Sequence, residues 1–244
     1  GSFLVVTVLA LISLVGLFLV EKNSPNPILS ANFMKRKEFV LPVIILFLTQ
    51  GLMQANMTNT IVFVNYTQPN NTAVSGYAIS VMYVGMSLGA VLIGPLADKF
   101  EPKKILLGSL LFTGIGCGLL LLFSEATPVF LLMAALGILG FGLGGNGTIF
   151  MKVVLSGIPD KDSGAGTGIY GLFRDLAAPF GAAVFVPMFT NRVANLINAE
   201  TAEFTAAIDS IKLLAVVELV CIAVGIITVL FLPEIYNNKK GETI

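Results

Sequence analysis

Long apolar runs without charge recur along the chain, and they constrain its fold more than any other feature. Seven segments are long enough to cross the roughly 30 Å hydrocarbon core of a bilayer as a helix, which takes about 20 residues. They cover residues 3–20, 39–64, 74–97, 104–123, 128–152, 164–189 and 211–232. Strands of a membrane barrel would have only about ten residues, of alternating polarity. The sequence therefore predicts an all-α integral membrane protein with seven transmembrane helices.

The composition supports this fold class and excludes several functions. Apolar residues make up 56% of the chain and charged residues 11%, whereas a soluble domain carries about 25% charge. The net charge is zero, so no basic surface for nucleic acid is expected. The absence of histidine excludes His-based triads and common zinc motifs. Cys117 and Cys221 lie in apolar runs and are interpreted as core residues, and we predict no metal and no cofactor.

Basic residues are concentrated in alternate connections between the predicted helices. Of the 14 Lys and Arg residues, Arg192 and Lys212 fall on one side, Arg174 lies inside a segment, and the other eleven fall on the opposite side. Loops on the cytoplasmic side carry the excess of Lys and Arg. We therefore expect a cytoplasmic C-terminus and, with seven crossings, an external N-terminus.

A dense charged group separates the third and fourth predicted helices. Within the stretch GPLADKFEPKKIL, residues 94–106, seven consecutive positions hold Asp98, Lys99, Glu101, Lys103 and Lys104. One interpretation is an anchor that fixes the topology. The other is a conformational latch, in which a carboxylate accepts hydrogen bonds at a neighbouring helix N-terminus while lysines bind carbonyls at helix C-termini.

This group resembles a known signature. Gly94, Asp98, Lys99, Lys103 and Lys104 resemble the cytoplasmic-loop motif G-x-x-x-D-R-x-G-x-[RK]-[RK] of the major facilitator superfamily, although Lys99 replaces the arginine and Glu101 the second glycine. Further stretches resemble the fourteen-helix drug:proton antiporters of that family, in the same order. They are residues 27–37, residues 66–68, and residues 162–168 followed by 174–176 and 181.

The resemblance implies a division of the chain. Residues 1–22 would be the last linker transmembrane helix, 23–38 a cytoplasmic linker, and 39–244 the C-terminal six-helix transporter domain with a short cytoplasmic tail. The last six helices would then form the C-terminal bundle of a major facilitator fold in a bacterial inner membrane. Because this is only the second half of such a transporter, we expect an N-terminal half, in the same polypeptide or in a separate chain.

Arg174 and Asp175 are charged residues inside a predicted span. They lie about ten residues into segment 164–189, close to the expected bilayer centre, where a charge costs at least about 2.5–3.5 kcal/mol. Neighbouring side chains on a helix point about 100° apart. We therefore expect each to meet a partner on another helix or in a cavity, not to neutralise the other. They are interpreted either as a proton-coupling or substrate site or as a structural interhelical ion pair.

Further polar residues are candidates for the same proton-coupling or substrate cavity. Gln50, Gln54 and Thr58 recur every four residues, and such a stripe must face protein or a cavity in lipid. Asn146 lies in a glycine-rich stretch that invites a helix break, and Glu218 lies in the last segment, either buried or reaching the interface. For the stripe, hydrogen bonds between helices are the alternative interpretation.

Pairs of glycines four residues apart predict close helix packing. The pairs are Gly85 with Gly89, Gly140 with Gly144, and Gly164 with Gly168. Small residues at this spacing let two helix backbones approach each other. The glycine-rich stretch around residues 144–147 lacks the G-K-[ST] ending of a phosphate-binding loop, so we expect an ion gradient to supply the energy.

These observations and the resemblance together predict a function. The chain is interpreted as half of a secondary active transporter that exports amphipathic drugs or other small molecules by alternating access, coupled to protons. Such transporters bind substrate near the membrane midplane between two repeats. The expected partners are the substrate, the proton, membrane lipid and the N-terminal half; nucleic acid and enzymatic activity are not expected. The alternative is a half-size, non-transporting remnant or an accessory membrane subunit.

Overall fold

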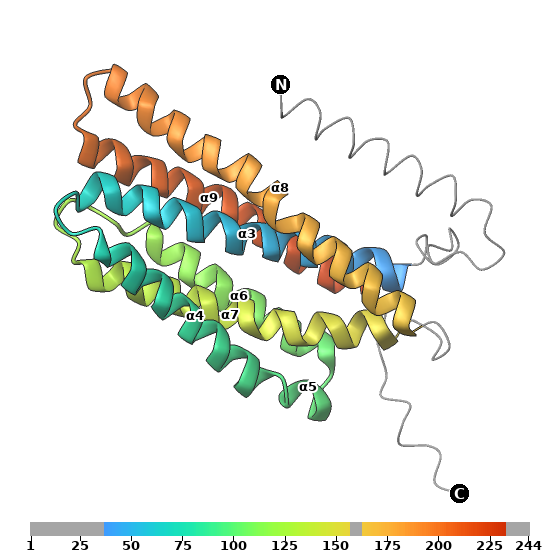
Figure 1. Cartoon of the computed structure of the whole chain (residues 1–244). Helices are drawn as coiled ribbons and strands as arrows, with labels where there is room; N and C mark the ends of the chain where they lie inside the picture. The colour runs from blue at the N-terminus through green and yellow to red at the C-terminus, as the bar shows by residue number, and fades with distance from the viewer. Residues whose placement is uncertain (1–36, 157–162, 233–244) are drawn as a thin grey trace, which may run out of the picture.

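The described part of the chain is a bundle of long helices. The structure is a computed structural model, and it describes residues 37–156 and 163–232. In these two ranges it contains no strand (Figure 1). The helices are α3 (Lys37–Thr67), α4 (Ala73–Ile93), α5 (Leu96–Lys99), α6 (Pro102–Leu120), α7 (Val129–Ser156), α8 (Ser163–Asn198) and α9 (Glu203–Leu230).

Six of these helices are long and apolar enough to cross a membrane. The spans are Val40–Thr67, Ala73–Ile93, Pro102–Leu120, Val129–Gly147, Tyr170–Asn198 and Glu203–Leu230. The described ranges thus contain six of the seven predicted helices, and segment 3–20 lies outside them. Backbone groups in lipid must be hydrogen-bonded within the protein, so apolar runs of this length form helices.

The predicted boundaries are wrong for three helices. Segment 74–97 was expected as one helix, but α4 ends at Ile93 and the one-turn helix α5 follows it. Pro95 explains the break, because proline cannot donate a backbone hydrogen bond. Two other helices are longer than predicted: α8 continues to Asn198, and α9 begins at Glu203. The added parts of both helices contain charged residues, so a search for uninterrupted hydrophobic runs does not include them.

The turn between α8 and α9 shows how α8 is terminated. Glu200 N donates to Ile197 O at 2.9 Å, and Thr201 N donates to Leu196 O at 3.0 Å. This pair of bonds is the Schellman motif, in which the residue after the helix adopts a left-handed conformation. Here that residue is Glu200, with φ of 63°. Glycine is the residue that adopts this conformation without a steric penalty.

We expect Glu200→Gly to stabilise the protein. The substitution removes the steric cost of the left-handed backbone, about 1 kcal/mol, at an exposed position. That gain corresponds to a rise in Tm of about 2–4 °C for a protein of this size. Thermal unfolding in detergent measures it. Glu203→Gly, also exposed but at the start of α9, is the control and should lower Tm, since glycine disfavours helix.

Glycines bring three pairs of helices into backbone contact. A Cβ at Gly89 would overlap Phe141 O, and one at Gly144 would overlap Met86 O, so α4 and α7 touch along their backbones. Gly51 and Gly181 form the same kind of crossing between α3 and α8, as do Gly116 and Leu139 between α6 and α7. The predicted pairs 85/89 and 140/144 therefore pack against each other's helices. Gly164 and Gly168 have no atom within 4 Å of an added Cβ.

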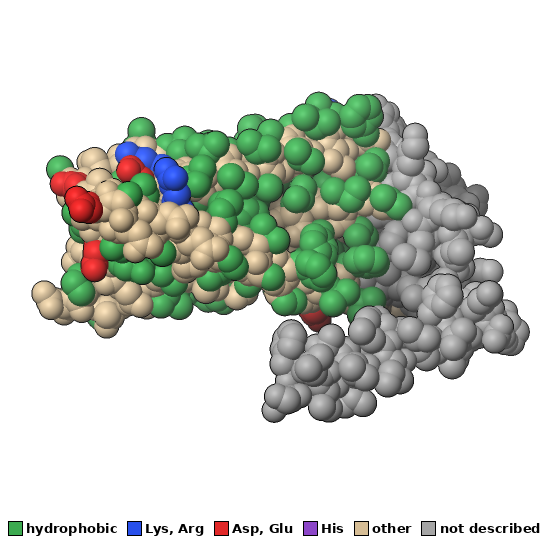
Figure 2. Space-filling view, turned by 90° about the horizontal axis from the view of Figure 1, so that it is seen from above, with side chains coloured by type: hydrophobic (Ala, Val, Ile, Leu, Met, Phe, Trp, Pro, Cys, Tyr) green, Lys and Arg blue, Asp and Glu red, His purple; other side chains and the backbone are tan. Residues whose placement is uncertain are grey.

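The outer surface of the bundle suits a lipid environment. Large apolar side chains are exposed along several of the spanning helices, including Leu111 on α6, Val184 on α8 and Val220 on α9. In Figure 2 hydrophobic side chains cover the middle of the visible face, and Lys, Arg, Asp and Glu side chains gather at one end. Monomeric soluble proteins rarely expose apolar surface so widely. The bundle is therefore a multi-pass membrane structure.

Candidate functional site

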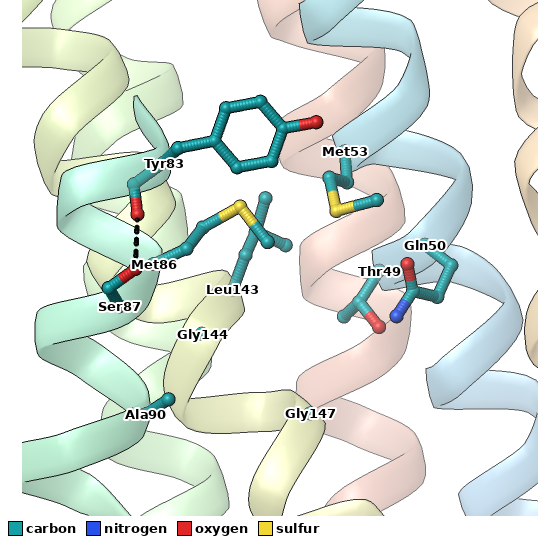
Figure 3. Close-up of a pocket in the computed structure, with 10 residues that line it drawn as sticks. All are labelled: Thr49, Gln50, Met53, Tyr83, Met86, Ser87, Ala90, Leu143, Gly144 and Gly147. Carbon is teal, nitrogen blue, oxygen red and sulfur yellow. Dashed lines mark hydrogen bonds between the residues drawn. The ribbon is translucent and has the colours of Figure 1, made fainter. Parts of the chain in front are cut away.

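A pocket of about 330 Å³ lies between α3, α4 and α7. Thr49, Gln50 and Met53 line it from α3, and Tyr83 and Met86 line it from α4. Leu143, Gly144 and Gly147 form its α7 wall. All these residues lie near the middle of their helices. Figure 3 shows the Tyr83 ring reaching from α4 toward Met53, with Gln50 and Thr49 below it.

The chemistry of this pocket is polar but uncharged. Gln50 offers an amide, Thr49 and Tyr83 offer hydroxyl groups, and Met53 and Met86 offer flexible thioethers. Pockets for small molecules combine mostly apolar walls with a few polar groups that orient the ligand. Methionine adapts its shape to different partners. The lining therefore suits amphipathic molecules of varied shape.

Only one of the three residues of the predicted polar stripe on α3 lines the pocket. Gln50 lines the pocket, whereas Gln54 and Thr58 are half-buried beyond it and bond to each other at 3.5 Å (Nε2 to Oγ1). Beside them, Tyr83 donates its hydroxyl hydrogen to Met57 Sδ at 3.3 Å. The stripe thus continues the α3 wall past the pocket.

Arg174 and Asp175 differ from their prediction in pairing. Arg174 lies 11 residues after the start of the 36-residue helix α8, about a third of the way along it. Arg174 Nε lies 3.0 Å from Asp175 Oδ1, so the two neutralise each other after all. The Arg174 and Asp175 side chains are exposed, by 49% and 71%, so packing does not restrain them. They are flexible enough to meet although neighbouring positions on a helix point about 100° apart.

Glu218 is buried at the junction of three helices. Its exposure is 0%. Asn56 of α3 donates from Nδ2 to Glu218 Oε1 at 2.8 Å, and the Cys117 thiol of α6 donates to Oε2 at 3.3 Å. Asn56 Nδ2 also donates to Leu52 O at 2.9 Å. Both carboxylate oxygens of Glu218, which lies on α9, are therefore hydrogen-bonded to neutral groups on other helices.

Asn146 is buried but does not line the pocket. Its exposure is 1%, and neither Oδ1 nor Nδ2 has a hydrogen-bond partner among the described residues. Its neighbours in α7, Gly144 and Gly147, do line the pocket. Ser109 Oγ on α6 is likewise buried and without a partner in the described ranges. Such orphaned polar groups are uncommon in proteins and require an explanation.

Two lysines at the end of the bundle near residues 94–104, Lys103 and Lys152, bind backbone carbonyls. Lys103 Nζ donates to Leu230 O at 2.8 Å and to Leu232 O at 3.1 Å, which caps the C-terminus of α9. Lys152 Nζ donates to Gly94 O at 3.4 Å. Cations are favoured at helix C-termini. These contacts join helices within the bundle.

Of the other charged residues of this loop, Lys99 and Lys104 are exposed and Glu101 is half-buried. Lys99 ends α5, and Lys104 pairs with Glu101 at 3.3 Å on the surface, which contributes little. Glu101 has φ of −58°, so this position needs no glycine even though the family motif has one there. The side chain of Asp98 lies outside the described part of the structure.

Sequence reasoning missed two residues that the structure brings to Glu218. Asn56 was not among the candidate site residues, and Cys117 was interpreted only as a core residue. They lie 162 and 101 positions from Glu218 in the chain. No local pattern connects positions so far apart. The only signal was that all three are polar or polarizable residues inside apolar segments.

Comparison with known proteins gives one family. The model described as Major Facilitator Superfamily matches residues 1–182 and 43–241. The chain is 31% identical to riboflavin transporter RibZ of Clostridioides difficile over 115 residues, 47% of this chain and 25% of that protein. It is 23% identical to multidrug resistance protein 3 of Bacillus subtilis over 192 residues, 75% of this chain and 36% of that protein.

A third relative has a different named substrate. Niacin transporter NiaP of Acinetobacter baylyi is 34% identical over 87 residues, 36% of this chain and 19% of that protein. The matches thus span about a quarter of RibZ and about a third of the multidrug resistance protein. The named relatives move small molecules of several chemical kinds.

Proposed function

Because this chain belongs to the Major Facilitator Superfamily, we propose that it is the C-terminal half of a secondary active transporter that exports small amphipathic molecules in exchange for protons. Members of this family are transporters and not enzymes. The proposed protein is of the fourteen-helix antiporter type. It resides in a bacterial inner membrane with the C-terminus in the cytoplasm.

The pocket between α3, α4 and α7 is the observation that carries this proposal. Transporters bind their substrates near the membrane midplane, at the interface between two repeats. The pocket lies at mid-length of three spanning helices and is lined by Gln50, Tyr83 and methionines. Its uncharged, adaptable lining supports amphipathic substrates. In the proposal this bundle supplies one wall and the N-terminal half supplies the other.

The surface of α8 supports a partner half. Gly164 and Gly168 are exposed with open space around them, and Arg174 and Asp175 are exposed within the same helix. Charged side chains in spanning segments face protein or water and not lipid. We propose that this part of α8 lies against the N-terminal half. Arg174 and Asp175 then border the cavity, where Asp175 takes part in proton coupling.

Export coupled to protons can be tested at Asp175. In the full-length transporter reconstituted into vesicles, we expect Asp175→Asn to abolish dye efflux driven by a proton gradient, because a neutral amide cannot bind and release a proton. Dye binding, measured by fluorescence quenching, should persist. The protein should still insert, since Asp175 is 71% exposed and no core contact is lost.

The matched control is Asp209→Asn, which makes the same change at an exposed position of α9. It should leave efflux at the wild-type rate. Normal gradient-driven efflux by Asp175→Asn would refute the role of Asp175. Absence of substrate-dependent proton movement in the wild-type protein, with every candidate amphipathic dye bound but not moved, would favour the non-transporting alternative.

A further inference from the structure

A row of buried polar side chains follows one side of α6. Ser109, Thr113 and Cys117 are spaced four residues apart, and each is at most 1% exposed. Residues at this spacing lie above one another on a helix, about 6 Å apart along its axis. That separation is about twice a hydrogen bond of 2.7–2.8 Å between oxygens. One water molecule can therefore join each pair of neighbouring groups.

One end of the row lies beside the pocket. Helices α6 and α7 pack so that Gly142 faces Thr113 and Gly145 faces Ser109, whose Oγ lies 2.7 Å from a Cβ added at Gly145. Asn146 follows Gly145 in α7, so its backbone lies at nearly the same height along the bundle as Ser109 of α6. The orphaned polar atoms of Asn146 and Ser109 therefore belong to residues at the same level of the bundle. On either side of Asn146, Gly144 and Gly147 line the pocket.

The other end of the row is the carboxylate of Glu218. Cys117 is its last member and donates to Glu218 Oε2. The packing of α6 against α9 keeps this register, because a Cβ added at Gly225 of α9 would lie 3.8 Å from Leu110 Cδ1, and Lys103 Nζ donates to Leu232 O. The row thus turns from the α7 side of α6 to its α9 side.

No positive charge compensates Glu218 within the described part of the chain. The titratable groups that face it are two thiols, Cys117 of α6 and Cys221 of α9. From α3 it receives Asn56, which is neutral. The charged residues of α8, namely Arg174, Asp175 and Arg192, are exposed. A buried acid without a counter-ion in a membrane protein marks a functional site.

We propose that this row, from Asn146 through Ser109, Thr113 and Cys117 to Glu218, binds internal water molecules and carries protons between the pocket and the Glu218 carboxylate. A proton from pocket water is relayed along the row and converts Glu218 from carboxylate to carboxylic acid; reversal returns it to the pocket. The orphaned Asn146 and Ser109 atoms are the first water-binding groups, since an internal water needs two to four polar partners. This proposal rests on the proposed function for its role in export.

Infrared spectroscopy of the full-length protein in lipid tests the row without any transport. The acid-minus-alkaline difference spectrum should contain a protonated carboxylic C=O band that is absent in Glu218→Gln. In D₂O the band should shift as its proton exchanges. We expect Thr113→Val, which keeps the shape but removes the hydroxyl, to slow that exchange at least about tenfold, which is about 1.4 kcal/mol in the barrier.

Two variants make the result specific. Asn146→Leu should slow exchange as Thr113→Val does, which provides a second test if Thr113→Val folds poorly. Thr228→Val makes the same Thr→Val change in α9, where the hydroxyl also donates to a carbonyl of its own helix, as Thr113 Oγ1 does to Ser109 O at 3.1 Å. Because the Thr228 hydroxyl lies outside the row, in an exposed hydrogen bond, this variant should exchange at the wild-type rate. A difference spectrum without a Glu218 band at any pH overturns the proposal, as does a band whose exchange is unchanged in both row variants.

The spectroscopic and transport results separate the two proposals. Proton-coupled export by a protein that shows no Glu218 band, or whose band exchanges at the same rate in both row variants, would retain the transporter and remove the row. A band slowed by Thr113→Val in a protein that moves no substrate would retain the row and remove proton-coupled export.

Discussion

Gly89→Leu is expected to prevent the bundle from assembling, because even the first carbon of a side chain there would overlap Phe141 O in α7. The added Cβ would also lie 2.9 Å from Phe141 C and 3.1 Å from Gly145 N. These are backbone atoms, which cannot rotate away as a side chain can. The expected cost is at the upper end of core overpacking, about 3 kcal/mol or more, and α4 would have to separate from α7.

Gly76→Leu is the matched control, because Gly76 lies in the same helix, is exposed, and has no atom within 4 Å of an added Cβ. Leucine favours helix over glycine by up to about 1 kcal/mol, so this variant should be as stable as wild type or more so. Yield of monodisperse protein and Tm in detergent measure both variants. Equal yields and equal Tm for the two would show that α4 and α7 do not touch along this line.

Asn56→Leu is expected to destabilise the bundle strongly, because it removes the 2.8 Å donor to the Glu218 carboxylate while leaving that group fully buried. A buried polar group that loses its partner costs about 1–3 kcal/mol, and a charged one costs more. Leucine has the same branching at Cγ as asparagine and is larger, so no cavity forms. We expect Tm to fall by about 6–12 °C for a loss of about 3 kcal/mol.

Gln54→Leu is the control on the same helix, because it also replaces an amide by leucine but removes only a long, half-buried bond to Thr58. Its Tm should change by no more than about 1–2 °C, as expected for a site without a strong contact. Adding Glu218→Gln to Asn56→Leu should recover part of the loss, since a neutral amide is less costly to bury than a carboxylate. Additive losses in the double variant would contradict the contact.

Local patterns predicted the elements of the fold that depend on local physics. Six of the predicted spans recur as helices, because a run of about 20 apolar residues has no other stable conformation in lipid. The helix ends were predicted less well. Pro95 breaks segment 74–97, and α8 continues past the charged residue Arg192 because Phe189 and Val193 on its inner side are fully buried. A search for uninterrupted hydrophobic runs detects neither the break at Pro95 nor the continuation of α8.

The candidate site could be predicted only in its polar members. The α3 stripe pointed to Gln50, which lines the pocket, but the opposite walls at Tyr83 and Leu143 carry no sequence signal. The prediction that Arg174 and Asp175 would not pair is wrong. Their side chains are long enough to bend toward each other and form the ion pair that was not expected from the 100° between neighbouring helix positions.

The sequence by itself determined that this chain is a helical membrane protein, that glycine pairs such as Gly85/Gly89 and Gly140/Gly144 allow close helix packing, and the family to which it belongs. These properties depend on run length, residue size and motif order, all of which are local. Only the tertiary structure decided that Asn56 and Cys117 meet Glu218, and that Asn146 lies level with Ser109 beside a pocket. These residues are distant in the chain. Their contacts follow from the relative register of packed helices, which no single helix encodes.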